Sequence, residues 1–221
     1  MFVHEIIPVT EPLVETTSDG RFYSPKPGVR YASVTTVMSH HSKQGIAEWR
    51  QKVGEAEANR ISRTAANRGT ALHTICEKYL LNQEYRSNDV MPTTFDLFNK
   101  IKTTIDENVE VVYGVETALY SDYLRVGGRV DAVVRWNGKK SIVDFKTSNK
   151  PKKEEWITSY FCQTAIYAVM FEERTGIPIP QIVIVMAPDG DGPGQIFIKK
   201  RDEYIDEAIK LINQYYEDKR K

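Results

Sequence analysis

Residues 127–146 read GGRVDAVVRWNGKKSIVDFK, two apolar runs on either side of Asn137-Gly138. An Asn-Gly pair between apolar runs is the strongest short-range signal for a two-residue β-hairpin turn. With that turn, counting back along both strands places Asp131 directly opposite Asp144. The stretch therefore predicts a β-hairpin that carries two opposed carboxylates.

The opposed carboxylates predict a site for a divalent cation. Opposed side chains of an antiparallel pair stand about 5 Å apart at Cβ, where like charges repel. A divalent cation relieves that repulsion, and carboxylate oxygens are good ligands for it. Lys146 follows Asp144 by two residues and so points to the same face. The alternative is a solvated hairpin in which Lys146 neutralises one acid, but the apolar flanking residues favour strands inside a sheet.

The composition is that of an ordinary globular protein. The 221 residues include 41% hydrophobic and 27% charged side chains, and the formal net charge is zero. A zero balance neither supports nor excludes a nucleic-acid partner, because local patches of charge matter more than the sum. No run approaches membrane-spanning length, and residues 1–20 are too acidic for a transit peptide. We therefore expect a cytoplasmic protein with no membrane partner.

Two cysteines, Cys76 and Cys162, are the whole thiol content of the chain. A four-thiolate zinc or iron–sulfur site needs four, so no iron–sulfur cluster is expected. Both lie in apolar helical patterns, which predicts buried free thiols. The sequence also lacks a GxxxxGK[ST] phosphate loop and a Gly-x-Ser-x-Gly elbow, so neither ATP nor a serine nucleophile is expected.

The remaining elements follow an α/β order with mixed strand pairing. Residues 1–30 look irregular around a Ser18-Asp19-Gly20 turn, and a helical region after Ser33 or Thr35 is interrupted at residues 68–70. Thr70 is the expected N-cap of the next helix. The later elements are expected as helices over 71–82, 93–108, 154–175 and 202–218, and strands over 111–121, 124–136, 140–147, 181–187 and 195–199.

Two of these helices carry polar pairs four residues apart, His73 with Glu77 and Gln163 with Tyr167. Residues at this spacing share a helix face. The helices alone leave two interpretations open for each pair: a ligand or substrate contact, and ordinary packing beside an apolar stripe. Glu116 is a single acid on a predicted strand, and the sequence is equally compatible with an exposed side chain there.

With these stretches in order, the chain resembles the PD-(D/E)XK nuclease superfamily, specifically its RecB-type exonuclease branch. The matching stretches are Arg68-Gly69-Thr70-Ala71-Leu72-His73, Gly128-x-x-Asp131, Asp144-Phe145-Lys146-Thr147 and Gln163-x-x-x-Tyr167. Residues 31–37 and 46–50 are similar to the N-terminal part of phage exonucleases and of the mitochondrial genome maintenance exonuclease. The resemblance covers residues 31–168.

The resemblance implies a fold. This is a restriction-endonuclease-like core, with a central mixed β-sheet flanked by helices in α-β-β-β-α-β order. Residues 1–221 would form a single nuclease domain, consisting of an N-terminal extension (1–67), a catalytic core (68–200) and a C-terminal helix (201–221).

The resemblance also implies a role for each matching residue. His73, Asp131, Asp144 and the backbone carbonyl of Phe145 would bind a catalytic Mg²⁺ or Mn²⁺ ion. Lys146 would position or deprotonate the attacking water.

Further residues would contact the substrate. Gln163 and Tyr167 would orient the site and touch the scissile strand, while Arg68 and Lys150 would contact flanking phosphates. Two acids, Glu77 and Glu116, would contact the metal ligands rather than the metal itself.

The function implied is metal-dependent hydrolysis of DNA by an exonuclease that prefers single-stranded ends. The alternatives are an endonuclease with the same site and a nucleic-acid-binding module without activity. Similarity also suggests replication or recombination proteins as partners, and the cytoplasm of a bacterium or of a phage-infected cell as the location. Helicase-linked relatives carry motor domains that this sequence lacks.

Overall fold

A computed structural model describes residues 1–85 and 91–221, in which nine strands form one sheet. In chain order the strands are β1 (Val3–His4), β2 (Leu13–Thr17), β3 (Gly20–Ser24), β4 (Tyr31–Ser33), β5 (Val109–Ser121), β6 (Val126–Trp136), β7 (Lys139–Ser148), β8 (Gln181–Pro188) and β9 (Gln195–Lys200). The helices are α1 (Val34–Val53), α2 (Glu55–Leu80), α3 (Pro92–Asn108), α4 (Thr158–Thr175) and α5 (Ile205–Asp218), with single 3₁₀ turns η2 (Glu154–Trp156) and η3 (Arg201–Glu203).

The sheet is mixed, as the sequence predicted. Its main path is β2-β3-β4-β6-β7-β8-β9, and β5 pairs with both β6 and β1. The β4–β6, β1–β5 and β7–β8 pairs are parallel, and the others are antiparallel. The expected α/β class, with a central mixed sheet between helices, is confirmed.

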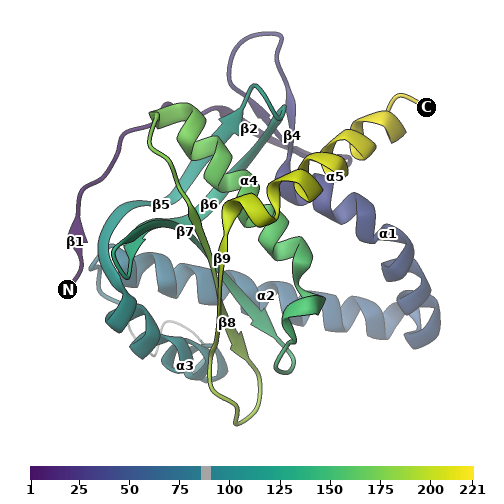
Figure 1. The fold of residues 1–221 in the computed structure, drawn as a ribbon. Helices are drawn as coiled ribbons and strands as arrows, with labels where there is room; N and C mark the ends of the chain where they lie inside the picture. The colour runs from purple at the N-terminus through teal and green to yellow at the C-terminus, as the bar shows by residue number, and fades with distance from the viewer. Residues whose placement is uncertain (86–90) are drawn as a thin grey trace.

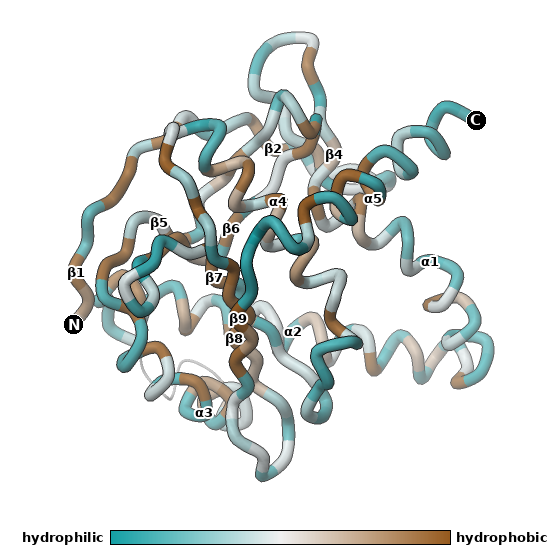
Figure 2. The backbone as a smooth tube through the Cα atoms, in the orientation of Figure 1, coloured by the Kyte–Doolittle hydropathy of each residue, from teal (hydrophilic) through white to brown (hydrophobic). Residues whose placement is uncertain are grey.

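Helices cover both faces of this sheet (Figure 1). One apolar cluster joins α1, α4 and α5 to the sheet, and a second joins α2 and α3 to it. Buried strands supply side chains to both clusters, as Ile182 and Val183 of β8 illustrate. Figure 2 shows the matching pattern, with apolar segments along the central strands and a hydrophilic C-terminal end.

The predicted hairpin is present. Asn137 and Gly138 both have positive φ, 48° and 77°, as a two-residue turn between twisted strands requires. The pairs from Trp136–Lys139 to Ala132–Val143 all keep the expected register. Pairing then stops one rung before Asp131 and Asp144.

The strands separate at that rung and form a fork. The edge of β6 that β7 leaves is next used by β4, which pairs with Val126 and Gly127. On the opposite edge, β5 accompanies β6 from Val126 to Trp136. Residues 128–131 therefore have no ladder partner on the forked edge, and side chains from both helix layers reach this opening.

The predicted break at residues 68–70 is wrong, because α2 is continuous from Glu55 to Leu80. Thr70 is not an N-cap. Its carbonyl accepts a hydrogen bond from the Thr74 hydroxyl at 3.1 Å, within the helix. A glycine inside a helix costs only about 1 kcal/mol, which the buried residues of α2 offset. The break lies instead at Gly54, where φ is 86°.

The prediction that residues 1–30 are irregular is also wrong in part. The Ser18-Asp19 turn joins β2 to β3, and β3 pairs with β4 through Phe22–Ala32 and Tyr23–Tyr31. These strands are short, β2 is mostly exposed and β3 is only partly buried, so they lack the apolar alternation that marks a strand in sequence.

The other predictions agree with the structure to within a few residues, except that η2 and η3 form separate turns before α4 and α5. Cys76 and Cys162 are buried free thiols, as expected. Among the described residues, no helix combines the length and apolarity needed to cross a membrane.

Candidate active site

A pocket of about 510 Å³ lies at the fork between β6 and β7. The pocket is lined by side chains from β3, β5, β6, β7, α1, α2 and α4. It brings together most of the residues that the sequence analysis singled out: His73, Glu77, Glu116, Asp131, Asp144, Lys146, Gln163 and Tyr167.

Asp131 sits at the centre of the fork. Its Oδ2 atom accepts a hydrogen bond from the backbone N–H of Phe145 at 2.7 Å, so a carboxylate replaces the missing ladder partner. Its Oδ1 atom is 3.2 Å from Nδ1 of His73 on α2. Burial raises the pKa of Asp131, but the hydrogen bond and charge of His73 outweigh it, so the pKa lies below its usual range.

The Phe145 carbonyl faces the same opening. In a strand the N–H and C=O groups of one residue point to the same edge, and the Phe145 N–H points to Asp131. This placement is compatible with the expected role of that carbonyl as a ligand.

Asp144 and Lys146 form a buried ion pair between Oδ2 and Nζ, with side chains 2% and 17% exposed. Burial raises the pKa of Asp144 to about 6, and the neighbouring Asp131 adds to the effect against Lys146. Burial lowers the pKa of Lys146, but the charges of Asp144 and Asp131 outweigh it and raise the pKa. The Asp144 Oδ2 atom is buried and receives no hydrogen bond of regular geometry from the described residues.

Glu116 has a more central position than the sequence suggested. It lies between the pairs Val115–Ala132 and Thr117–Val130, which places it opposite Asp131. Its φ of 48° is rare for a residue with a side chain, and such a conformation costs about 1–3 kcal/mol. Burial raises the pKa of its carboxyl to about 7, with a further contribution from Asp131.

His73, Glu116 and Asp131 form a group that fits a divalent cation. One ligand atom from each lies within 4.8 Å of the other two. Two carboxylates and an imidazole are competent ligands for such an ion. Asp144, which we expected as a ligand, is not part of this group among the described residues. Its carboxylate, paired with Lys146, lines the same pocket beside this group.

Gln163 and Tyr167, the polar pair on α4, lie beside Gly128 of β6. Gln163 donates a hydrogen bond to the Tyr167 hydroxyl at 3.0 Å, and both side chains are buried. A Cβ atom on Gly128 would lie 2.5 Å from Cε1 of Tyr167. Gly128 is therefore required because the tyrosine ring occupies the space of a side chain.

Two expected substrate contacts lie outside the residues that line the pocket. The Arg68 guanidinium is held by an ion pair with Asp189 and a 2.8 Å hydrogen bond to Asn149. Lys150 is exposed on the loop after β7. Their expected contacts with phosphate stay predictions.

Two cations of the pocket, Arg21 and Arg129, were not predicted from the sequence. A signal for Arg129 was available, because it precedes Asp131 by two residues on one strand. Nothing in the sequence pointed to Arg21, since the strand that carries it was not expected.

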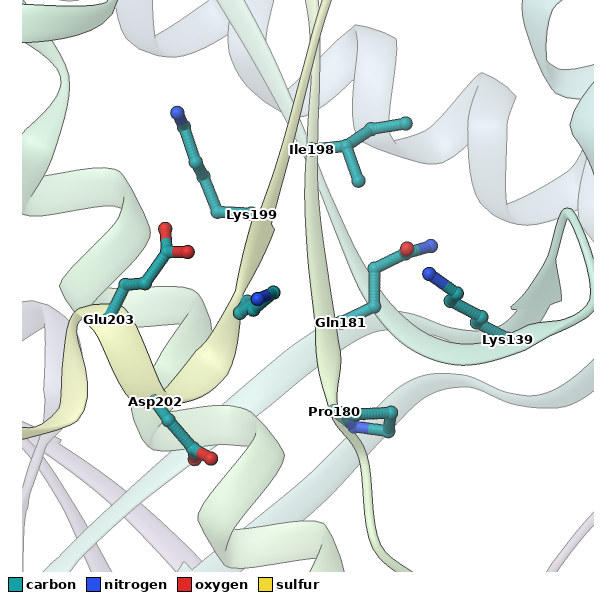
Figure 3. Close-up of a pocket in the computed structure, with 8 residues that line it drawn as sticks. Lys139, Pro180, Gln181, Ile198, Lys199, Asp202 and Glu203 are labelled. Atoms are coloured by element: carbon teal, nitrogen blue, oxygen red, sulfur yellow. The ribbon is translucent and has the colours of Figure 1, made fainter.

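A second hollow lies at the ends of β8 and β9, away from the fork (Figure 3). Its Lys199 is paired with Glu154 at 2.5 Å, and its Asp202 with Arg201 at 2.8 Å. This hollow contains none of the expected site residues. Its lining is Lys139, Pro180, Gln181, Ile198, Lys199, Lys200, Asp202 and Glu203.

Comparison with known proteins gives a family match over most of the chain. The family model of the PD-(D/E)XK nuclease superfamily matches residues 36–214. This range includes every residue that lines the pocket except Arg21 and Thr35. A search of curated proteins finds no match.

Two solved structures are similar to this chain at low sequence identity. The structure of SSO0001 is 13% identical, with a TM-score of 0.39 over 83% of this chain and 83% of that chain. The structure of LHK-Exo in complex with dAMP is 17% identical, with a TM-score of 0.34 over 62% of this chain and 70% of that chain.

Proposed function

Because this chain belongs to the PD-(D/E)XK nuclease superfamily, whose members use divalent metals, we propose that it is a DNA exonuclease dependent on Mg²⁺ or Mn²⁺. We further propose that it acts on single-stranded ends and belongs to the RecB-type branch. The observation that carries the proposal is the cluster of His73, Glu116 and Asp131 beside the buried Asp144–Lys146 pair.

The cation would be held by His73, Glu116 and Asp131, with Asp144 and the Phe145 carbonyl beside them. When bound, a divalent cation supplies positive charge against the scissile phosphate and makes water a stronger nucleophile at neutral pH. The acids themselves transfer no proton in this proposal.

Lys146 has two conceivable roles, and its surroundings favour one. Its Nζ atom is paired with Asp144, and in the metal-free protein the charges of Asp144 and Asp131 outweigh the effect of burial and raise its pKa, so the amine is a cation at neutral pH. A protonated amine donates hydrogen bonds but accepts no proton. We therefore assign Lys146 to positioning the attacking water and adding positive charge there, rather than to deprotonating it.

Gln163 and Tyr167 would contact the scissile strand from α4. Their mutual hydrogen bond and the packing of Tyr167 on Gly128 fix both side chains at the pocket wall. Such pre-organisation reduces the entropy lost when substrate is bound in a reactive geometry.

The catalytic assignment is tested with Asp144→Ala and Lys146→Ala. Either change should abolish Mg²⁺-dependent degradation of DNA while far-UV circular dichroism stays that of the parent. Lys140→Ala is the matched control, because Lys140 is an exposed lysine on the same strand. Digestion at the parental rate by either site variant would overturn the assignment.

The mode of attack is tested with linear and closed circular single-stranded DNA, with Mg²⁺ or with EDTA. An exonuclease degrades the linear strand and leaves the circle intact, so cleavage of the circle favours the endonuclease alternative. Oligonucleotides labelled at the 5′ or 3′ end report strand polarity. Salt-dependent binding without products in Mg²⁺ or Mn²⁺ would favour the non-catalytic module.

We also propose that residues 1–221 act as one domain, because both apolar clusters pack on one sheet. The position 67/68, expected to separate the extension from the core, lies inside α2. Replication or recombination partners stay predictions from the resemblance, and a cytoplasmic location stays a prediction from the sequence.

A further inference from the structure

Two arginines line the pocket in addition to the residues already assigned. Arg21 lies on β3 and Arg129 on β6. Within the described part of the chain, neither side chain forms an ion pair with an acid, whereas Arg68 is paired with Asp189. These two guanidinium groups are therefore available to an anionic ligand.

Arg21 is held in place by its backbone. Its N–H donates to the Thr36 hydroxyl oxygen at 3.1 Å, and that hydroxyl donates to the Arg21 carbonyl at 3.3 Å. Two residues later, Tyr23 packs so closely on β6 that a Cβ atom on Gly127 would lie 2.4 Å from it. The strand is thus docked against both α1 and β6.

The two arginines line the same pocket, and Tyr23 on β3 packs on β6, the strand that carries Arg129. Burial raises the pKa of Tyr23, and the charges of both Arg21 and Arg129 act in the opposite direction. Arg129 donates one hydrogen bond to the carbonyl of Glu116. A guanidinium has five N–H donors, so Arg129 keeps donors free for a ligand.

The charge of the pocket explains why two more cations matter for a polyanionic substrate. One lysine, Lys146, faces four acids: Glu77, Glu116, Asp131 and Asp144. Even with a divalent cation bound, these groups would carry one net negative charge and would repel a nucleic-acid strand. The charges of Arg21 and Arg129 make the net charge of the pocket positive.

We propose that Arg21 and Arg129 together bind the phosphodiester next to the scissile one on the substrate strand. Arg129 precedes Asp131 by two residues, which is about 6.6 Å along a strand. This is close to the spacing of consecutive phosphates in an extended single strand. Guanidinium groups suit such a ligand because their donors match two phosphate oxygens at once.

It follows that the hairpin of β2 and β3, which lies outside the matched family range, completes the active site. This inference rests on the proposed nuclease function, since it assigns the substrate phosphate of the same site.

The test compares the parent with Arg21→Ala, which spares the Arg129 contact to Glu116. The exposed Arg220 supplies the matched control, Arg220→Ala. For single-stranded oligonucleotides with Mg²⁺, we expect Arg21→Ala to raise KM about tenfold with little change in kcat. The slope of log(kcat/KM) against log[salt] should become shallower by about 0.7, the value for one phosphate contact on a single strand.

Arg21→Lys should restore part of the affinity, because it keeps the charge without the planar fork. An unchanged melting temperature establishes that each variant is folded. Parental KM and salt dependence in Arg21→Ala would overturn the inference while leaving the nuclease proposal intact. Absence of Mg²⁺-dependent cleavage in the parent would instead overturn the nuclease proposal.

Modified substrates distinguish an internal phosphodiester from a terminal phosphate. A single neutral methylphosphonate beside the scissile linkage should lower kcat/KM of the parent about tenfold. It should lower kcat/KM of Arg21→Ala much less, because that variant has already lost the contact. If removal of a terminal phosphate produces this loss and the internal methylphosphonate does not, the assignment to an internal phosphodiester is wrong.

Discussion

Replacing Gly128 with alanine tests the contact between the Gly128-x-x-Asp131 and Gln163-x-x-x-Tyr167 motifs. The new Cβ atom would meet Cε1 of Tyr167 at 2.5 Å and the terminal methyl of Met170 at 3.4 Å. Tyr167 and Met170 are buried on α4, so the ring has little room to retreat. We therefore expect Gly128→Ala to destabilise the fold and to displace the tyrosine hydroxyl from Gln163.

The magnitude follows from two opposing effects. Overpacking a buried site by one methyl group costs about 1–3 kcal/mol in the free energy of unfolding. Alanine also restricts the unfolded chain, which returns about 0.4–1 kcal/mol. The net loss is on the order of 1–2 kcal/mol, or roughly 2–8 °C in melting temperature for a chain of this length.

The assay is thermal unfolding of metal-free protein followed by circular dichroism, with Mg²⁺-dependent digestion of DNA measured in parallel. Gly45→Ala is the matched control, because this glycine lies inside α1 with no atom within 4 Å of an added Cβ. That change should stabilise the protein by up to about 1 kcal/mol.

A double-mutant cycle identifies the clashing partner. Tyr167→Leu removes the ring atom, so Gly128→Ala should destabilise that background less than it destabilises the parent. Equal losses in both backgrounds, or a Gly128→Ala protein as stable as the parent, would show that the close contact does not explain the glycine.

Three further predictions concern the titratable groups. Burial raises the pKa values of Asp144 to about 6 and of Glu116 to about 7, so the folded state binds these protons more tightly than the unfolded state does. Their contribution to the free energy of unfolding of the metal-free protein is therefore complete below about pH 4 and is lost as the pH rises towards 7. Between these pH values the free energy of unfolding of Glu116→Gln should fall by about 1–3 kcal/mol less than that of the parent, as denaturant titrations at each pH would show. His73→Ala should weaken Mn²⁺ binding at least tenfold and reduce the Mn²⁺-induced increase in melting temperature by about 3–5 °C, and an unchanged increase would exclude this ligand. Burial raises the pKa of Cys76 well above its ordinary value, so its thiol should react with alkylating reagents only after unfolding, as mass spectrometry of native and denatured protein would show.

The sequence alone was sufficient for the hairpin and its register. The Asn137-Gly138 turn is determined by local backbone preferences, and period-two alternation then aligns the residues on either side. These are short-range effects, so they are legible in a few consecutive residues. Family resemblance added the order of the motifs, and the match over residues 36–214 confirms the superfamily.

The predictions were wrong where the local sequence signal is weak and contacts with distant segments determine the structure. Gly69 looked like a helix break, yet its neighbours on α2 pack into the core and keep the helix continuous. The strands β2 and β3 carry little apolar alternation, because mainly one side chain, Tyr23, is buried. β3 pairs with β4, and β4 lies next to β6, a strand about 95 residues later in the chain.

Only the tertiary structure decided how the site is completed. The hairpin brings Asp131 and Asp144 to the same end, but there β7 leaves the edge of β6 that β4 uses further along. Glu116 reaches Asp131 through a backbone conformation with positive φ, and Arg21 arrives on a strand from the N-terminal segment. Each of these placements depends on contacts between segments far apart in the chain, and such contacts leave no periodic signal in the residues that make them.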